Sequence, residues 1–388
     1  MNSRFVSNKP IKVIGCGLAG MEVAFILANY GFTVHIFDNG DNSAKHKKFD
    51  YYNPYEIFLT ENMKYELECL GSPLFSIAKK ENFDKFGFKY SEEFMNKVKS
   101  ILLSKPNVKL FSGNIDTLNE TETNIIATGH NTDKKLLKNL EDYIGNQRIC
   151  YFNPENLVLN AEHIDLEKLN FVTETECYAN VTLEEYEKLY NKIVKYNSQY
   201  QLPKEIANEK QITVESIARR GYGGLRNSVL RPHFDENTMS RTKTYASLKM
   251  TYNKSKNVLI VDNFFTAFDT EEQIDIFNSI EVLNGFEIEK PSVIRRKTYL
   301  LTPACVNENL QVIDHENIFV CGGLLGTNGS FESLLMADLC AYSVIEQLDH
   351  YIGTKYLKED CCVGKIYENL FKKSVVNFRL FNLKYDII

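Results

Sequence analysis

The sequence predicts an α/β fold, in which a domain built on a parallel sheet is split in sequence by an α+β insertion. Near the start of the chain, a glycine-rich turn joins a short apolar segment to an apolar helix pattern, and a second apolar segment follows. Near the other end, another apolar segment stops at a pair of glycines. The middle of the chain instead carries capped helices and apolar runs typical of an antiparallel sheet. Strands that alternate with helices indicate a parallel sheet at the two ends of the chain.

The first predicted elements form one βαβ unit. Residues 11–15 are a buried strand, 21–30 are an apolar helix that Gly31 would end, and 33–38 are the second strand. Another buried strand is expected at 124–130, stopping at Gly129. These strands predict a Rossmann-like domain.

The middle of the chain predicts a different architecture. Capping-box signals at Thr182 and Asp269 each predict a helix, and the apolar runs between them predict antiparallel strands. A buried strand at 317–323 and a helix at 331–348 then return to the first pattern. We therefore predict one domain formed by 1–170 and 295–388, with an insertion domain at 171–294.

Composition narrows the classes of function. The chain has 388 residues, 45 basic and 51 acidic, and its net charge of −6 excludes a protein that coats nucleic acid through overall charge. Its nine cysteines include no CxxC pair and its seven histidines show no metal spacing, so no metal site is predicted. Reduced thiols and the lack of an apolar run of ~18 residues predict a cytoplasmic chain that does not enter a membrane.

The glycine-rich turn predicts a dinucleotide site. Residues 15–20 read GCGLAG, a GxGxxG motif placed between a strand and a helix. Gly15 permits the tight turn, Gly17 lets the backbone approach a pyrophosphate, and Gly20 allows helix and strand to pack closely. Leu18 and Ala19 complete the start of the helix, whose N-terminus attracts phosphate. Asp38 ends the second strand, where a carboxylate would accept a hydrogen bond from a ribose hydroxyl.

Two later strand ends favour FAD over NAD as the dinucleotide. One strand ends in ATG, with Thr128 and Gly129, and the other ends in CGG, with Gly322 and Gly323. This arrangement, with the glycine motif close to the N-terminus, is typical of FAD-dependent oxidoreductases. Each of these ends is also compatible with an ordinary turn after a strand.

Several segments resemble the TrmFO family, the folate- and FAD-dependent tRNA (uracil-5-)-methyltransferases. They follow the family's order from one end of the chain to the other. The segments are VIGCGLAGMEVAFILANYGFTVHIFD (13–38), VESIARRGYGGLRNSVLRPHF (214–234), IRRKTYLLTP (294–303), FVCGGLLGTNGSFES (319–333) and VVNFRLFNL (375–383). The fourth segment carries the family's Glu332 and Ser333, which the resemblance adds to the predicted cofactor site.

The resemblance implies a reaction as well as a fold. In the family, NAD(P)H reduces FAD, methylenetetrahydrofolate gives a one-carbon unit to the reduced flavin, and the unit passes to carbon-5 of a uridine. A cysteine thiolate that adds to carbon-6 makes carbon-5 nucleophilic, which is covalent catalysis. The partners implied for this chain are tRNA or rRNA.

The chain departs from the family at residues that carry this chemistry. Neither family cysteine is present, and Gln211 stands where one of them would be. Arg295 replaces the family histidine that faces folate, Gly323 replaces a glutamine and Ser330 replaces a tyrosine. The cofactor cradle is therefore retained, whereas the residues for methyl transfer are largely changed.

Cys177 is a candidate for the missing nucleophile, although the neighbouring Glu174 and Glu176 should disfavour a thiolate. Arg295 and Arg296 are candidates to hold an anionic ligand near the flavin. The basic stretch 219–243 would either contact phosphate groups or form salt bridges with the acidic insertion.

Three functions remain open from the sequence. The first is FAD- and folate-dependent uridine 5-methylation with an unusual nucleophile. The second is an FAD-dependent NAD(P)H oxidoreductase without methyl transfer. The third is a non-catalytic, FAD-bound partner subunit. The missing cysteines favour the second and the third. The retained central motif at 214–234 favours the first, because a simple oxidoreductase would not need it.

Overall fold

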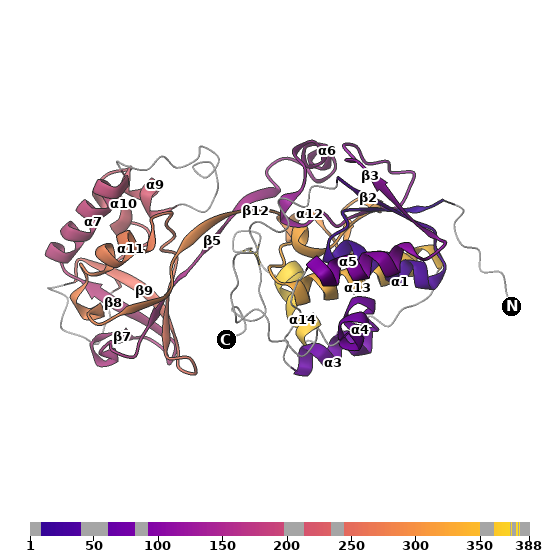
Figure 1. The fold of residues 1–388 in the computed structure, drawn as a ribbon. Helices are drawn as coiled ribbons and strands as arrows, with labels where there is room; N and C mark the ends of the chain where they lie inside the picture. Colours follow the sequence, from indigo (N-terminus) through magenta and orange to yellow (C-terminus); the bar gives the residue numbers. More distant parts are fainter. Residues whose placement is uncertain are drawn as a thin grey trace. The chain divides into compact units, whose positions relative to one another are not determined.

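The chain divides into two compact units. The structure, a computed structural model, describes residues 9–39, 61–81, 92–197, 213–233, 244–349 and 361–372, with Ser374, Phe378 and Leu380. Unit 1 comprises residues 1–150 and 297–388, and unit 2 comprises residues 151–296 (Figure 1).

The predicted boundary at 170/171 falls too late in the sequence. Strand β6 (Leu157–Asn160) pairs with β10 (Val258–Val261) and β11 (Glu287–Lys290), so it belongs to the sheet of unit 2. The chain passes between the units along β5 (Ile149–Glu155) and returns along β12 (Val293–Leu300), and these two strands form a two-stranded sheet. The predicted second boundary, at 294/295, lies close to the observed one at 296/297.

Unit 1 is built on a six-stranded sheet in the order β13-β14-β4-β1-β2-β3. All neighbouring pairs are parallel except β13 with β14. The strands are β1 (Ile11–Ile14), β2 (Val34–Asp38), β3 (Val108–Ser112), β4 (Asn124–Ile126), β13 (Gln311–Val312) and β14 (His315–Val320). This is the predicted α/β fold with a parallel, Rossmann-like sheet.

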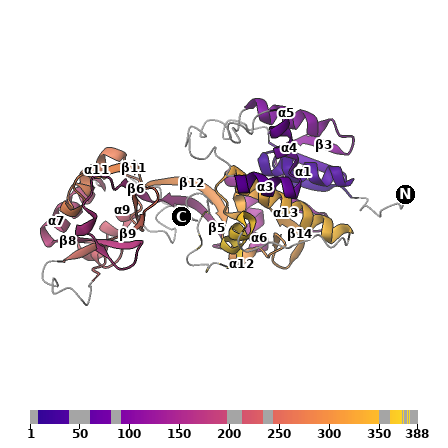
Figure 2. The ribbon, with the colours of Figure 1, turned by 90° about the horizontal axis from the view of Figure 1, so that it is seen from below.

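Helices α1, α5 and α13 lie side by side against this sheet (Figures 1 and 2). The helices of unit 1 are α1 (Leu18–Tyr30), α3 (Glu61–Leu70), α4 (Pro73–Lys80), α5 (Glu92–Leu103), α6 (Lys134–Ile144), α12 (Thr302–Cys305), α13 (Ser330–Asp349) and α14 (Cys362–Tyr367). The 3₁₀ turns are η2 (Gly129–Asn131) and η5 (Gly322–Leu325), and a π-helical turn, η6 (Glu368–Lys372), follows α14. Helix α1 ends at Gly31 in the left-handed conformation, as the sequence predicts.

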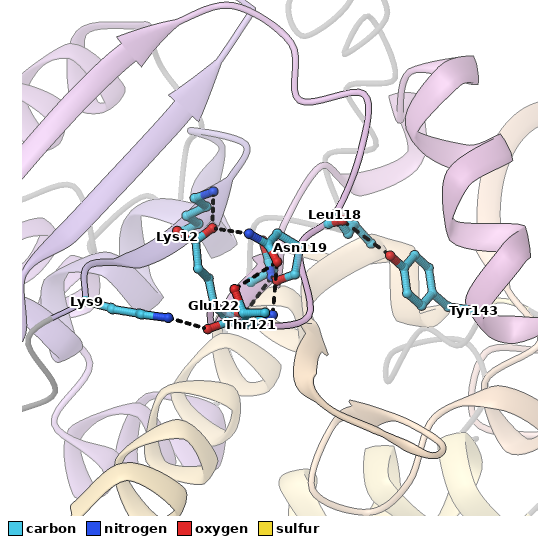
Figure 3. Close-up of polar contacts among 8 residues, drawn as sticks. Lys9, Lys12, Leu118, Asn119, Thr121, Glu122 and Tyr143 are labelled. Carbon is cyan, nitrogen blue, oxygen red and sulfur yellow. Dashed lines mark hydrogen bonds and ion pairs between the residues drawn. The ribbon is translucent and has the colours of Figure 1, made fainter.

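Side chains hold the amino ends of the parallel strands in unit 1. Lys12 of β1 pairs with Glu122, and Lys9 Nζ donates to the carbonyl of Thr121 over 3.2 Å (Figure 3). Asn124, at the start of β4, donates to the carbonyl of Asn119 over 2.8 Å. The loop before β4 is therefore fixed to β1 by polar side chains at this end of the sheet.

Two carboxyl groups lie buried where α1 packs on α13. Glu22 accepts hydrogen bonds from the Ser72 hydroxyl and from Leu74 N, the latter over 2.9 Å. The carboxyl group of Asp338 is fully buried and lies beside that of Glu22. Burial raises the pKa of Glu22 to about 7 and raises that of Asp338 well above its ordinary value, with a further contribution from the charge on Glu22. The pair therefore favours protonated carboxyl groups.

Unit 2 is built on a six-stranded antiparallel sheet in the order β11-β6-β10-β9-β8-β7. The strands not yet given are β7 (Asn170–Phe171), β8 (Glu176–Val181) and β9 (Ala246–Asn253). Helices gather over this sheet in Figures 1 and 2: α7 (Leu183–Asn197), α9 (Val214–Ala218), α10 (Gly223–Arg226) and α11 (Thr270–Phe277). Two 3₁₀ turns, η3 (Leu166–Lys168) and η4 (Glu281–Leu283), complete the unit.

The two predicted capping boxes of unit 2 are present. Thr182 and Glu185 exchange hydrogen bonds at the start of α7, and Asp269 and Glu272 do so at α11. The apolar spacing within these two helices predicts that Leu183, Val194 and Ile274 point inward. That prediction is wrong, since these side chains are 47%, 41% and 39% exposed. Only a narrower stripe of each helix faces the core.

Glu215 of α9 is a buried carboxyl group in unit 2. Its Oε1 accepts hydrogen bonds from the Thr266 hydroxyl over 2.6 Å and from Ala267 N over 2.7 Å. Asn197 of α7 donates to the Glu215 carbonyl over 3.0 Å. This residue therefore ties α9 to α7 and to the segment that follows β10.

No described helix has both the length and the apolar character that a bilayer crossing requires.

Candidate dinucleotide site

The turn after β1 shows why its glycines have different functions. Gly15 has φ +106°, and a Cβ there would lie 2.6 Å from the Ala127 carbonyl oxygen. A Cβ on Gly20 would lie 2.0 Å from the Gly15 carbonyl oxygen. Around Gly17, by contrast, no described atom lies within 4 Å of the Cβ position. Gly15 and Gly20 are therefore required by the fold itself, and Gly17 leaves the open approach that a pyrophosphate needs.

Helix α1 begins at this open position. Gly17 is its N-cap, no side chain caps it, and its first turn carries no acidic residue. Leu18 and Ala19 are almost fully buried, so the start of the helix is rigidly packed. A helix N-terminus of this kind favours an anion through its N–H groups and its partial positive charge.

Asp38 lies beside the same turn. It is the last residue of β2, and the carbonyl of the preceding residue, Phe37, accepts a hydrogen bond from Gly15 N over 2.8 Å. Gly113 N donates to the Asp38 carbonyl over 3.0 Å, which fixes the end of β2 to the end of β3. The structure therefore brings the predicted ribose-binding carboxylate to the edge where the glycine turn lies.

Two further turns meet the first one. Ala127 N donates to the Ile14 carbonyl over 2.8 Å and Cys321 N donates to the Ile126 carbonyl over 3.0 Å, so β1, β4 and β14 end together. Gly322 has φ +69°, and a Cβ on it would lie 2.7 Å from the Cβ of Ala19. The ATG and CGG turns therefore meet at the start of α1.

Thr128 and Gly129 shape the turn after β4. The Thr128 and Thr132 hydroxyl groups form a hydrogen bond of 2.7 Å, and Thr132 Oγ1 also donates to the Gly129 carbonyl over 2.9 Å. Gly129 has φ +64°, in the left-handed region. This backbone conformation turns the chain at once into η2.

Glu332 and Ser333 belong to the first turn of α13. The Glu332 carboxylate folds back over Gly329, where a Cβ would come within 1.9 Å of Oε2. Ser333 N donates to the Gly329 carbonyl over 3.1 Å. A glycine at 329 is therefore needed for Glu332 to occupy this position beside the helix start.

His130 is a residue of this region that the sequence did not single out. Its Nδ1 donates to the Thr298 carbonyl over 3.2 Å, and a Cβ on Gly323 would lie 2.9 Å from its Nε2. Burial and the charge of Lys297 lower the pKa of His130 to about 4, so the imidazole is neutral at ordinary pH. Its position directly after the ATG motif was the signal that could have identified it.

Cys177 has none of the properties of a nucleophile. It lies in β8 opposite Met250, its side chain is fully buried, and burial together with Asp262 and Glu176 raises its pKa to about 12. The predicted effect of the acidic neighbour is present, but burial is the larger cause. A thiol in this state is inert.

The predicted basic residues are only partly within the described region. Arg295 and Arg296 lie in β12, and their side chains are outside the described residues, as are Gln211, Arg241 and Lys243 altogether. Arg226 donates to the Tyr245 carbonyl over 2.8 Å and stacks on the Tyr245 ring, and Arg220 and Arg231 are exposed. Among the residues that the structure describes, no cluster of three or more potential metal ligands occurs.

Known proteins are similar to this chain over most of its length. A protein of Natranaerobius thermophilus named methylenetetrahydrofolate–tRNA-(uracil-5-)-methyltransferase TrmFO is 24% identical over 97% of this chain and 92% of its own length. A protein of the same name from Dictyoglomus thermophilum is 27% identical over 84% of this chain and 79% of its own. GidA of Aquifex aeolicus, a solved structure, is 12% identical and covers 97% of this chain and 71% of its own, with a TM-score of 0.46.

A family profile also matches most of the chain. The profile described as glucose inhibited division protein A matches residues 10–341, which include the three glycine turns and all of unit 2. This match supports FAD as the cofactor, and the glycine cradle at the ends of β1, β4 and β14 has the open approach that FAD requires. The chain belongs to the glucose inhibited division protein A family and is a TrmFO-like member of it.

Proposed function

We propose that this chain is an FAD-dependent, TrmFO-like enzyme that uses methylenetetrahydrofolate to methylate carbon-5 of a uridine in tRNA or rRNA. One observation carries the proposal: relatives named for this reaction align with as much as 97% of the chain, so the similarity includes unit 2 as well as the dinucleotide site. Unit 2 carries the retained central motif at 214–234, which a simple oxidoreductase would not need.

The proposed cofactor site uses the residues at the three turns. The backbone at Gly15, Gly17, Leu18, Ala19 and Gly20 would hold the pyrophosphate, and Asp38 would accept a hydrogen bond from a ribose hydroxyl. The remaining wall would come from the later turns and the start of α13: Thr128, Gly129, Gly322, Gly323, Glu332 and Ser333. FAD, when bound, supplies the capacity to accept hydride from NAD(P)H and to carry a one-carbon unit.

The proposed RNA and folate contacts rest on basic side chains. Arg220 and Arg231 in unit 2 are exposed and therefore accessible to phosphate groups. Arg295 and Arg296, with backbone in β12, are proposed to contact the anionic tail of folate. Cys177 is not part of the proposal, because its thiol is buried and its pKa is about 12.

A second candidate function is an FAD-dependent NAD(P)H oxidoreductase without methyl transfer. The state of the thiols favours it, because burial raises the pKa of Cys177, Cys305 and Cys362 to about 12. Uracil methylation by the family's route needs a thiolate that can reach the base. A non-catalytic, FAD-bound partner subunit is the remaining alternative from the sequence.

The deciding experiment combines two measurements on one reaction mixture. The FAD-loaded protein is incubated with NADPH, methylenetetrahydrofolate and an unmodified tRNA or rRNA transcript, and 5-methyluridine is measured by mass spectrometry while flavin absorbance is followed. Folate-dependent formation of 5-methyluridine supports the proposal. Bleaching of the flavin by NADPH with no 5-methyluridine supports the oxidoreductase. If deletion of the gene also leaves every 5-methyluridine of cellular RNA intact, methylation is ruled out.

A further inference from the structure

One imidazole lies where the glycine turns of unit 1 meet. His130 follows the ATG motif directly, and it is the first residue after Gly129 in η2. Its ring atoms Nε2, Cε1 and Cδ2 would lie 2.9, 3.1 and 3.3 Å from a Cβ on Gly323. The ring edge therefore occupies the space into which any side chain at position 323 would extend.

This contact explains a glycine that backbone geometry does not require. The φ angle is positive at Gly322 but not at Gly323, so the backbone at 323 is compatible with any L-residue. The obstacle to a side chain at 323 is the imidazole, because the three nearest atoms to its Cβ position all belong to His130.

His130 also contacts the backbone of two further residues. Its Nδ1 lies 3.2 Å from the Thr298 carbonyl, which only accepts hydrogen bonds, and the backbone of Thr327 forms a second hydrogen bond with the ring. Thr298 lies in β12, which leads into the segment before α12. One side chain thus links the turn after β4, the turn after β14 and β12.

We propose that His130 is a positioning residue of the dinucleotide site, whose imidazole holds the ATG turn, the CGG turn and β12 in the arrangement that binds the flavin, and that Gly323 is bare because the imidazole occupies its side-chain space. The inference rests on the FAD site of the proposed function, and it does not depend on methyl transfer. The lowered pKa of His130 agrees with a ring that serves as a neutral hydrogen-bond donor.

A double-mutant cycle tests the contact between the two positions. FAD affinity is measured by fluorescence quenching for the wild-type protein, His130→Ala, Gly323→Ala and the double variant. Gly323→Ala should weaken FAD binding roughly tenfold or more in the wild-type background and by a clearly smaller factor in the His130→Ala background. Equal losses in both backgrounds would overturn the inference. If the wild-type protein binds no FAD, both the proposed function and this inference are wrong.

A second comparison, between two variants at position 130, shows whether His130 positions the site or only fills space. His130→Gln retains an N–H donor, whereas His130→Phe retains the ring volume without one. The absorption spectrum and midpoint potential of bound FAD should remain close to wild type in His130→Gln and shift in His130→Phe. Wild-type spectra and potentials in both variants would show a structural role only and would contradict the proposal. Thermal melts of the FAD-free variants establish that each one is folded.

Discussion

The glycine turns of unit 1 and two polar side chains of unit 2 differ in how accessible they are. In unit 1, glycines leave backbone accessible where three parallel strands end, and Gly17 has open space around it. In unit 2, the thiol of Cys177 and the carboxyl group of Glu215 are fully buried among packed side chains. Unit 1 therefore presents a binding surface made of backbone, and unit 2 uses the same residue types that catalysis would need to stabilise its core. A chemically suitable residue type is thus informative only when its surroundings keep it accessible.

The largest effect is expected at Gly20, where the backbone of unit 1 is packed most tightly. A methyl group there would lie 2.0 Å from the Gly15 carbonyl oxygen, which is a backbone atom of the packed turn between β1 and α1. Gly20→Ala should destabilise FAD-free unit 1 by ~3 kcal/mol or more, as overpacking of rigid elements does. Urea unfolding measures the loss. A Gly20→Ala variant as stable as wild type would show that the β1–α1 contact is looser than the structure indicates.

Gly17 should behave differently from Gly20, although both belong to the same motif. No described atom lies within 4 Å of the Gly17 Cβ position, so Gly17→Ala should leave FAD-free stability unchanged. Its methyl group would obstruct the approach of a pyrophosphate and weaken FAD binding by about 100-fold, or roughly 2.7 kcal/mol. Equilibrium dialysis with FAD measures this loss. Unchanged affinity would place the phosphates elsewhere.

The variant Glu215→Ala tests how much a buried carboxyl group contributes to the stability of unit 2. Glu215→Ala removes the acceptor for the Thr266 hydroxyl and Ala267 N, so the loss should be about 2 kcal/mol. Chemical denaturation gives the value, and Glu289→Ala, at an exposed position of β11, is the matched control. FAD affinity should not change, since the proposed cofactor residues lie in unit 1. A loss no larger than that of the control would mean that these hydrogen bonds contribute little.

Asp338 should make the stability of unit 1 depend on pH. In the folded protein the pKa values of Glu22 and Asp338 are raised, so the unfolded chain releases these protons at lower pH than the folded chain does. Stability from this pair is therefore fully present near pH 4 and decreases as the pH rises toward about 7. Tyr342 belongs to the same cluster, and its pKa is raised by burial first and then by the charges of Asp338 and Glu22.

Asp338→Asn should reduce this pH dependence and stabilise unit 1 by ~1–2 kcal/mol at pH 7, with little effect at pH 4. Thermal unfolding at a series of pH values measures the change, with exposed Asp142→Asn as the control. Parallel stability curves for wild type and Asp338→Asn would refute a shared, protonated pair.

The smallest effect is expected for Cys177. Its burial predicts that Cys177→Ala costs about 1 kcal/mol of stability through the small cavity it leaves. Any 5-methyluridine formation should be unchanged, and Cys305→Ala, another buried thiol with a pKa of about 12, should behave alike. Loss of methylation in Cys177→Ala but not in Cys305→Ala would establish Cys177 as the nucleophile. Unit 2 would then carry an accessible catalytic group, contrary to the comparison above.

The elements that could be predicted from the sequence are those that local patterns encode. The glycine turn between β1 and α1, the left-handed end of α1 at Gly31 and the two capping boxes depend on neighbouring residues, so spacing alone predicts them. The family resemblance came from the same contiguous motifs. The inward faces of α7 and α11 were only partly predictable, because a periodic pattern does not state how wide the buried stripe is.

Features that depend on distant residues became visible only in the folded chain. Strand β6 pairs with β10 and β11, so the first boundary between the units lies earlier in the sequence than predicted. No local sequence pattern indicates that pairing. The contact of His130 with Gly323 and the burial of Asp338 beside Glu22 join residues that are far apart in sequence. The inertness of Cys177 has the same origin, since the free energy of forming a thiolate depends mainly on the packing that removes water from it.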